Sequence, residues 1–166
     1  MKKFGCAQLA LIMIVIVALV FGLLFFGINN FLNGILADKV LEELPKYTDS
    51  ETFETNDKTD YLNYTKYFYG ESVDAAVSKS EYLKKLDEES RQLLEEQLTH
   101  YEEWVETKAY EGYDFTRDII SENDRLYIEN KETFDGYSGL PDKFSAYSIY
   151  FFDAETRILY YMHYNI

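Results

Sequence analysis

The fold is decided near the C-terminus, where residues 146–164 read AYSIYFFDAETRILYYMHY. Two aromatic and β-branched runs, Ala146 to Phe152 and Arg157 to Tyr164, flank the loop Asp153-Ala154-Glu155-Thr156. Runs of this composition around a short loop predict an antiparallel β-hairpin. The hairpin is therefore the starting point for the rest of the chain.

The first strand of this hairpin carries large side chains on both faces. Alternate residues of a strand point to opposite sides, so one face carries Tyr147, Ile149 and Phe151 and the other carries Tyr150 and Phe152. We expect one face to pack on a helix. The other face needs cover from the segment that precedes the domain, from loops, or from a partner protein.

A long helix is predicted upstream of the hairpin, from Lys79 to Thr107. Ser78 and Glu81 have the spacing of a capping box at its start. Apolar residues then repeat at helical spacing along one stripe. The stripe consists of Leu83, Leu94, Leu98, Tyr101 and Val105, with Leu86 and Trp104 on its flank, and its first half also contains Asp87 and Ser90. A helix followed by short strands predicts the α+β class, with one long helix packed on an antiparallel meander.

The segment between residues 46 and 70 is predicted to be a linker that contains one strand. Lys46 to Asp60 is polar and has no periodicity, which is typical of a linker or an exposed loop. Tyr61 to Tyr69 is rich in aromatic residues and is predicted to be a strand. Residues 71–166 are interpreted as the α+β soluble domain.

The N-terminus has the composition of a transmembrane helix. Residues 7–28 read AQLALIMIVIVALVFGLLFFGI, and Gln8 is the single polar side chain among them. At about 1.5 Å per residue this helix is roughly 30 Å long, the thickness of the hydrocarbon core of a bilayer. The alternative is a cleaved signal peptide, but its cleavage position would rest on Ile35 and Ala37, and the apolar run is longer than such peptides need.

The sequence around the apolar run predicts its orientation. Residues 1–6 form a short basic head that we expect to be cytoplasmic in the cell membrane, which places residues 38–166 outside. Lys39 and Lys46 on the other side keep the reverse orientation open. Cys6 is either an acylation site beside the bilayer or a small residue at a helix end.

Residues 29–45 continue the helical spacing as a stalk, which Pro45 ends. This stalk packs on its own domain, on the membrane surface or on a partner.

Composition excludes several classes of function. The formal charge is −14, and Lys2 and Lys3 are the charged residues of the first 37, so residues 38–166 carry −16. Nucleic-acid binding needs clustered basic residues and is not expected. One cysteine excludes an internal disulfide and a Cys-only zinc site. Aromatic residues make up 17% of the chain, which favours a packed domain over a disordered one.

The sequence contains few candidates for chemistry, and we predict no catalytic, cofactor-binding or metal site. Glu96, His100 and Glu103 form the most metal-like grouping, at three- and four-residue spacing. They point away from the stripe of Leu98, so we expect a solvated charged face. His163 is expected to be a hydrogen-bonded structural histidine.

Two further sequence matches are less specific. Asp153 and Glu155 form an acid pair in the hairpin loop, and Asn63-Tyr64-Thr65 matches a glycosylation acceptor. Among 30 acidic residues, pairs of the first kind arise by chance.

The leading hypothesis is a membrane-anchored, extracytoplasmic, non-enzymatic protein-interaction module. Its expected partners are the lipid bilayer, through residues 7–28, and an unidentified protein, because tyrosine is enriched at protein interfaces. The alternative is a sensor or binder of a cation or a small cationic ligand, which the charge of −16 on residues 38–166 would attract. An enzyme is the third hypothesis, and no constellation of residues supports it.

Overall fold

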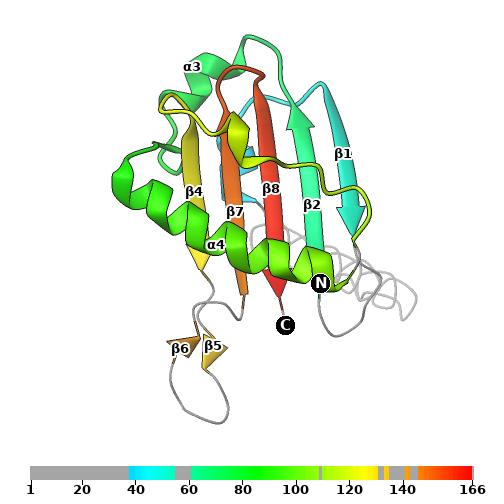
Figure 1. Ribbon diagram of the computed structural model, residues 1–166. Coiled ribbons are helices and arrows are strands. Elements are labelled where there is room, and N and C mark those ends of the chain that lie inside the picture. The colour runs from blue at the N-terminus through cyan, green and yellow to red at the C-terminus, as the bar shows by residue number, and fades with distance from the viewer. Residues whose placement is uncertain are drawn as a thin grey trace, which may run out of the picture. The chain divides into compact units, whose positions relative to one another are not determined.

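The computed structural model describes residues 38–54, 61–108, 110–130, 133–134, 141–142 and 146–165. Six strands form one antiparallel sheet in the order β1-β2-β8-β7-β4-β3 (Figure 1). The strands are β1 (Asp49–Glu54), β2 (Tyr61–Phe68), β3 (Lys84–Lys85), β4 (Arg125–Asn130), β7 (Ala146–Asp153) and β8 (Ile158–Asn165). The short strands β5 (Thr133–Phe134) and β6 (Pro141–Asp142) pair with each other. The helices are α2 (Lys39–Glu43), α3 (Val73–Val77), α4 (Glu88–Thr107) and the 3-10 turn η1 (Arg117–Ile119).

The predicted α+β class and the predicted C-terminal hairpin are confirmed. β7 and β8 pair in continuous register, from Ala146 opposite Asn165 to Asp153 opposite Ile158, within one residue of the expected bounds. The strands do not follow chain order as a meander would, because β2 lies beside β8 and joins the first third of the domain to its end. That pairing has no local signal in the sequence.

Asp153 organises the loop of this hairpin. Its carboxylate accepts hydrogen bonds from the backbone N–H groups of Glu155 and Thr156 and from the hydroxyl of Thr156. Asp commonly stabilises turns in this way, by accepting hydrogen bonds from backbone N–H groups a few residues further along the chain. Arg157 then takes a left-handed backbone conformation, with φ of 59°. The acid pair in the loop therefore consists of a buried turn residue and an exposed neighbour.

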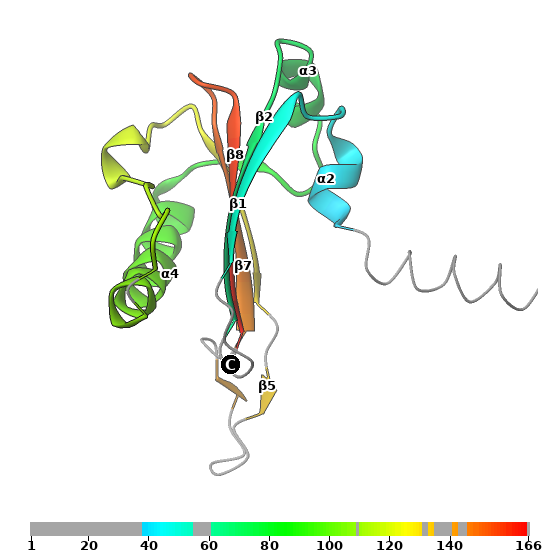
Figure 2. The ribbon, with the colours of Figure 1, turned by 90° about the vertical axis from the view of Figure 1, so that its right-hand side faces the viewer.

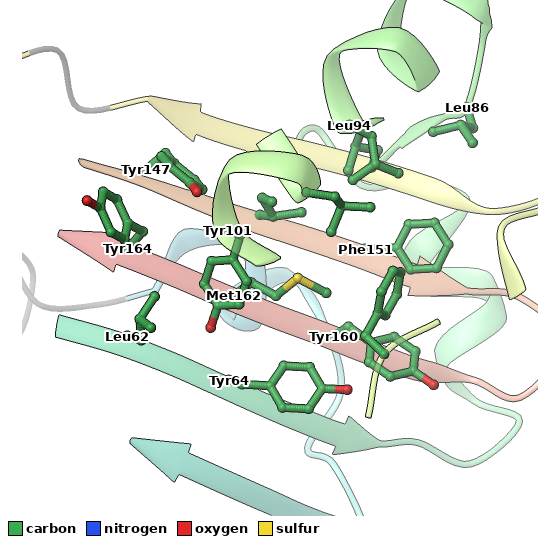
Figure 3. Close-up of a cluster of buried hydrophobic side chains, with 14 residues drawn as sticks. Leu62, Tyr64, Leu86, Leu94, Tyr101, Tyr147, Phe151, Tyr160, Met162 and Tyr164 are labelled. Atoms are coloured by element: carbon green, nitrogen blue, oxygen red, sulfur yellow. The ribbon is translucent and has the colours of Figure 1, made fainter. Parts of the chain in front are cut away.

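One face of the sheet packs on α4 (Figure 2). Leu94, Leu98 and Tyr101 of the helix are fully buried. Figure 3 shows how side chains from β2, β7 and β8 converge under them. The sheet residues of this core are Leu62, Tyr64, Leu126, Tyr147, Ile149, Phe151, Tyr160, Met162 and Tyr164. The predicted contact between a hairpin face and the long helix is thus confirmed.

The opposite face is covered at one end by α2 and α3 (Figure 2). This second core contains Val40 and Leu44 beside α3, together with Phe152 and Leu159 from the hairpin. The stalk prediction was residues 29–45. The part of the stalk that the structure describes packs on its own domain, which was one of the three alternatives.

The start of the long helix was predicted wrongly. It begins at Glu88, not at Lys79. Leu83 is buried in the core with α2 and α3, whereas Leu86 is buried in the core with α4. Two residues this close in sequence cannot reach opposite faces of the sheet from one helical stripe. The chain instead passes around the edge of the sheet as β3, so Leu83 does not belong to the helix.

The capping box lies nine residues further along than expected. Asp87 is the N-cap of α4, and its carboxylate accepts a hydrogen bond from the backbone N–H of Ser90 at 2.8 Å. The hydroxyl of Ser90 accepts from the N–H of Asp87 at 2.9 Å. Ser78, assigned to the predicted box, is the C-cap of α3. Both boxes fit the spacing rule, and tertiary packing selects the second.

The predicted linker at residues 46–60 contains a strand. β1 pairs with β2 over six residues, from Asp49 opposite Phe68 to Glu54 opposite Asn63. The prediction missed it because Phe53 is its single apolar residue, and an edge strand exposed to solvent needs no alternation. The predicted strand at Tyr61–Tyr69 is confirmed as β2.

The predicted transmembrane helix at residues 7–28, the head at residues 1–6 and most of the stalk lie outside the described residues. Within the ranges that are described, no helix combines the length and the apolar character needed to cross a bilayer. The anchor and its orientation stay predictions.

Candidate functional site

A row of polar side chains crosses the sheet face opposite α4. Strand register places neighbouring members opposite one another on five successive strands. This polar row consists of Glu54 (β1), Asn63 (β2), His163 (β8), Ser148 (β7) and Glu129 (β4). The face is distinct from the α4 core because these residues alternate in sequence with buried core residues such as Leu62.

Hydrogen bonds connect the members of the polar row in pairs. Nδ2 of Asn63 donates to Oε1 of Glu54 at 2.9 Å. Oγ of Ser148 lies 2.9 Å from Nδ1 of His163. The hydroxyl of Thr65 lies 3.0 Å from Oδ1 of Asn63. Asn63 and Ser148 are buried, His163 is half-buried and Glu54 is exposed. The row therefore grades from a packed centre to a solvent-exposed end at β1.

An aromatic row lies next to the polar row, toward α2 and α3. We define it as Tyr127, Tyr150 and Tyr161, from β4, β7 and β8. The ring centroids are 5.8 Å apart for the first pair and 4.9 Å for the second. Tyr161 also stacks on the His163 ring at 6.1 Å and 5°. These contacts fix the imidazole in one plane against the sheet.

The Ser148–His163 pair resembles part of a hydrolase site, and its surroundings argue against that role. A nucleophilic serine needs access to substrate and donors that stabilise an oxyanion. Ser148 is 3% exposed, in the middle of a strand. A strand directs its N–H groups to its neighbours in the sheet, so they do not converge above the hydroxyl. The pair is suited to hydrogen bonding, as was predicted for His163.

A second polar cluster lies on the α4 side, around Lys66. Its ammonium lies 2.7 Å from Glu51 on β1 and 2.8 Å from Asp114 in the segment after α4. The hydroxyl of Tyr64 donates to the same Asp114 carboxylate at 2.8 Å. Lys66 is buried, whereas both carboxylates reach solvent. The cluster fastens the segment after α4 to the first two strands.

The electrostatics of this cluster favour the charged forms of Lys66 and Asp114. Burial alone lowers the pKa of Lys66, but hydrogen bonds to Asp114 and Glu51 outweigh it and the pKa is raised. Burial alone raises the pKa of Asp114, but the bonds from Lys66 and Tyr64 outweigh it and the pKa is lowered. Burial, followed by the bond to Asp114, raises the pKa of Tyr64 far above its usual value. These shifts move the pKa values of Lys66, Asp114 and Tyr64 further from neutral pH.

Arg117 fastens the same segment to α4. One guanidinium nitrogen donates to Glu95 at 2.6 Å, and the other donates to Glu102 and lies 3.2 Å from Thr99. The hydrogen bond to Glu102 raises the pKa of Arg117. The last turns of α4 carry acids where the helix dipole favours cations. Arg117 supplies the missing positive charge from outside the helix, which the sequence did not indicate.

The metal-like grouping on α4 is only partly a solvated face. Glu96 and Glu103 are exposed, as predicted, and they line an open depression of about 350 Å³ with Thr99 and His100. His100 is half-buried, however, because its Nδ1 lies 2.9 Å from the Tyr147 hydroxyl. Within the described part of the chain, no group of three or more His, Cys, Asp or Glu is arranged to hold a metal ion.

Comparisons with known proteins give no relative. No protein-family model matches the chain, and no curated protein or solved structure matches it.

The glycosylation match at Asn63 falls inside the sheet. Its side chain is 6% exposed and donates to Glu54, so the amide nitrogen is not presented to an enzyme in the folded domain. A sequence match of this kind is meaningful only on an accessible loop.

Sequence reasoning missed both the polar row and the Lys66 cluster. The row depends on the register between β2 and β8, which brings Asn63 beside His163. A signal for the cluster was present: Lys66 lies inside the aromatic run of β2, and a buried charge requires a partner of opposite charge. The identity of that partner, Asp114, follows only from the tertiary fold.

Proposed function

We propose that the chain is a single-pass membrane protein, anchored through residues 7–28, whose acidic α+β domain is a non-enzymatic protein-interaction module. The observation that carries the proposal is the partly covered sheet face. At one end α2 and α3 bury it, and beyond them lie the aromatic row and the polar row. Half-buried Tyr161 and His163 combine apolar surface with hydrogen-bonding groups there.

The other polar clusters support the same proposal. Lys66 and Arg117 each form ion pairs with two carboxylates of the domain itself. The Asp153 carboxylate accepts hydrogen bonds from its own loop. These groups hold elements together, and they are not arranged around a space for a substrate. Charge and aromatic surface are then the properties that the domain presents to another protein.

Site-specific photo-crosslinking in the native membrane tests the proposal. A photoreactive amino acid replaces His163 or Glu129 in the full-length chain, and the control position is Gln92 on the exposed side of α4. We expect a discrete higher-mass adduct from the two row positions and none from Gln92. Monomer alone at every position, or the same adducts from all three, would refute an interaction through this face.

The anchor has its own test. Protease added to intact cells should digest the domain and leave a membrane fragment that contains residues 7–28. Intact mass spectrometry should find the apolar run still attached. A mature chain that begins near Asp38 would instead identify the run as a cleaved signal peptide.

A second candidate is the binding of a small organic cation on α4. The observation that favours it is the open depression beside Glu96 and Glu103. A thermal-shift titration with spermidine should raise the unfolding temperature more than sodium chloride of equal ionic strength. The double variant Glu96→Gln and Glu103→Gln should abolish the difference, while Glu88→Gln and Glu89→Gln should retain it. No excess stabilisation by spermidine would remove this candidate.

A further inference from the structure

We propose that β1 is a docking edge on which a partner protein adds an extended basic segment as a further strand. The inference rests on the proposed function and names the surface and the chemistry of the partner. β1 is the first strand in the sheet, and among the residues that the structure describes it pairs only with β2. Such an edge presents backbone N–H and C=O groups that can template another strand.

One hydrogen bond identifies the outward backbone groups of β1. The N–H of Ser50 donates to the carboxylate of Asp49 at 2.8 Å, so it is not directed at β2. Neighbouring residues of a strand direct their backbone groups to opposite edges. Ser50, Thr52 and Glu54 therefore direct N–H and C=O away from the sheet. An incoming strand would hydrogen-bond to Thr52 and Glu54, and at Ser50 it would replace the Asp49 carboxylate as the acceptor for the N–H.

The edge is accessible and firmly held. Every residue of β1 is exposed except Phe53, which is half-buried against the α4 core. The carbonyl of Phe53 accepts a hydrogen bond from the Tyr110 hydroxyl. Gly112, with φ of 101°, passes so close to the Phe53 ring that a Cβ atom there would collide with it. Because β1 is already ordered, binding does not incur the entropy cost of ordering this strand.

Charge selects the partner. β1 carries Asp49, Glu51 and Glu54, and within the described ranges the cation that contacts them, Lys66, is shared by Glu51 and Asp114. Opposite charges on adjacent strands stabilise their pairing. Asp49 and Glu51 lie on the α4 face of the strand. A segment with Lys or Arg at alternate positions would place its cations beside them.

The same charges disfavour a second copy of this chain. Pairing β1 with another β1 would set acid against acid, and residues 38–166 carry −16. The opposite edge, β3, has Lys84 and Lys85 but is only two residues long. Acidic residues on an edge commonly protect it from other edges. A basic extended segment is the one strand that these residues attract.

The test uses a labelled peptide of about eight residues, alternating Lys and Val, a typical strand length. It is titrated by fluorescence anisotropy against the full-length chain in lipid nanodiscs. The control peptide has the same sequence with backbone N-methyl groups on both edges, which keeps the charge and removes the donors. We expect the control to bind at least about tenfold more weakly, because each lost hydrogen bond to an ordered edge weakens binding.

Protein variants supply the matching measurement. Ser50→Pro removes an outward N–H, and proline is tolerated on such an edge. It should weaken peptide binding about tenfold while circular dichroism stays unchanged. Asp49→Asn should also weaken binding, and Glu88→Gln should not. Hydrogen exchange at Thr52 and Glu54 should slow when the unmethylated peptide binds.

Three results would overturn the inference. The first is equal affinity of the two peptides, which would indicate unspecific attraction between charges. The second is no added protection of the β1 amides, a readout that stays valid if Ser50→Pro does not fold. The third is a dimer in sedimentation that Ser50→Pro dissociates, which would make a second copy the occupant. The crosslinking experiment separates this inference from the proposed function. If a partner still crosslinks to position 163 in the Ser50→Pro variant, the β1 inference fails and the proposed function stands. If no position crosslinks to a partner, the proposed function itself fails.

Discussion

The ammonium of Lys66 lies 2.8 Å from Oδ2 of Asp114, and this ion pair joins β2 to the segment that follows α4. The lysine is 11% exposed at its side chain and the aspartate is 59% exposed. The pair is therefore asymmetric: the cation is enclosed, and the anion closes it off from solvent. Removing the lysine and removing the aspartate therefore have different consequences for stability.

Lys66→Met should lower the free energy of unfolding by about 1–2 kcal/mol, because both carboxylates left behind can be hydrated while the hydrogen bonds are lost. Urea denaturation measures the change. Lys46→Met, at an exposed lysine outside the sheet, is the control and should have little effect. Equal stability of the two variants would show that the Lys66 pair contributes nothing net.

Asp114→Asn should destabilise the domain near neutral pH and lose this effect in acid. The pKa of Asp114 is lowered in the folded state, so its contribution is present above the ordinary carboxyl pKa of about 4 and disappears as the pH falls through the lower folded value. Urea midpoints of both proteins across acid pH measure this. A difference that stays constant down to about pH 2 would contradict the assignment.

Alkaline pH should unfold the domain and ionise its core tyrosines in one step. Burial raises the pKa of Tyr64, Tyr101, Tyr113 and Tyr147 above the usual tyrosine value. The unfolded chain therefore releases protons that the folded chain retains, and stability falls as the pH rises above about 10. Tyrosinate absorbance and circular dichroism, recorded together, should show a late shared transition. Complete ionisation before any loss of structure would refute this burial effect.

Gln97→Leu should stabilise the domain. Gln97 lies on α4 with 0% exposure, and among the residues that the structure describes neither polar atom of its side-chain amide has a hydrogen-bond partner. Replacing a buried unsatisfied amide by an apolar side chain of similar size should gain about 1–3 kcal/mol. Thermal and urea unfolding measure the gain, and Gln92→Leu on the exposed side of α4 is the control. A loss of stability would imply that an ordered water satisfies the amide.

Ser90→Ala should lower the unfolding temperature more than Ser78→Ala. Ser90 completes the capping box with Asp87, and its loss frees a backbone N–H at the start of α4. Ser78 lies at the end of the five-residue helix α3, where its hydroxyl donates to Ala75. Differential scanning calorimetry of the two variants compares the boxes directly. The reverse order would support the earlier helix start.

Local patterns predicted the hairpin, the strand β2 and the body of α4, because alternation and helical periodicity act over a few residues. They did not predict where α4 begins, since Leu83 satisfies the helical stripe as well as it satisfies the second core. They did not predict β1 either, because its stability comes from pairing with β2 and not from its own side chains.

The candidate site depends even more on long-range register. His163 was recognisable as a structural histidine, but its neighbours on both sides come from other strands. A shift of the β2–β8 register by two residues would replace Asn63 opposite His163 and leave the same residues facing the core. Local alternation carries no information about such a shift.

The passage of the chain between Leu83 and Leu86 around β3 has a consequence for assembly. The turn places Lys84 and Lys85 beside Arg125 and Leu126 of β4, so this margin of the sheet ends in a strand of two exposed lysines. A short, charged margin of this kind disfavours the addition of a further strand, so the two margins of the sheet differ in how readily they can extend it.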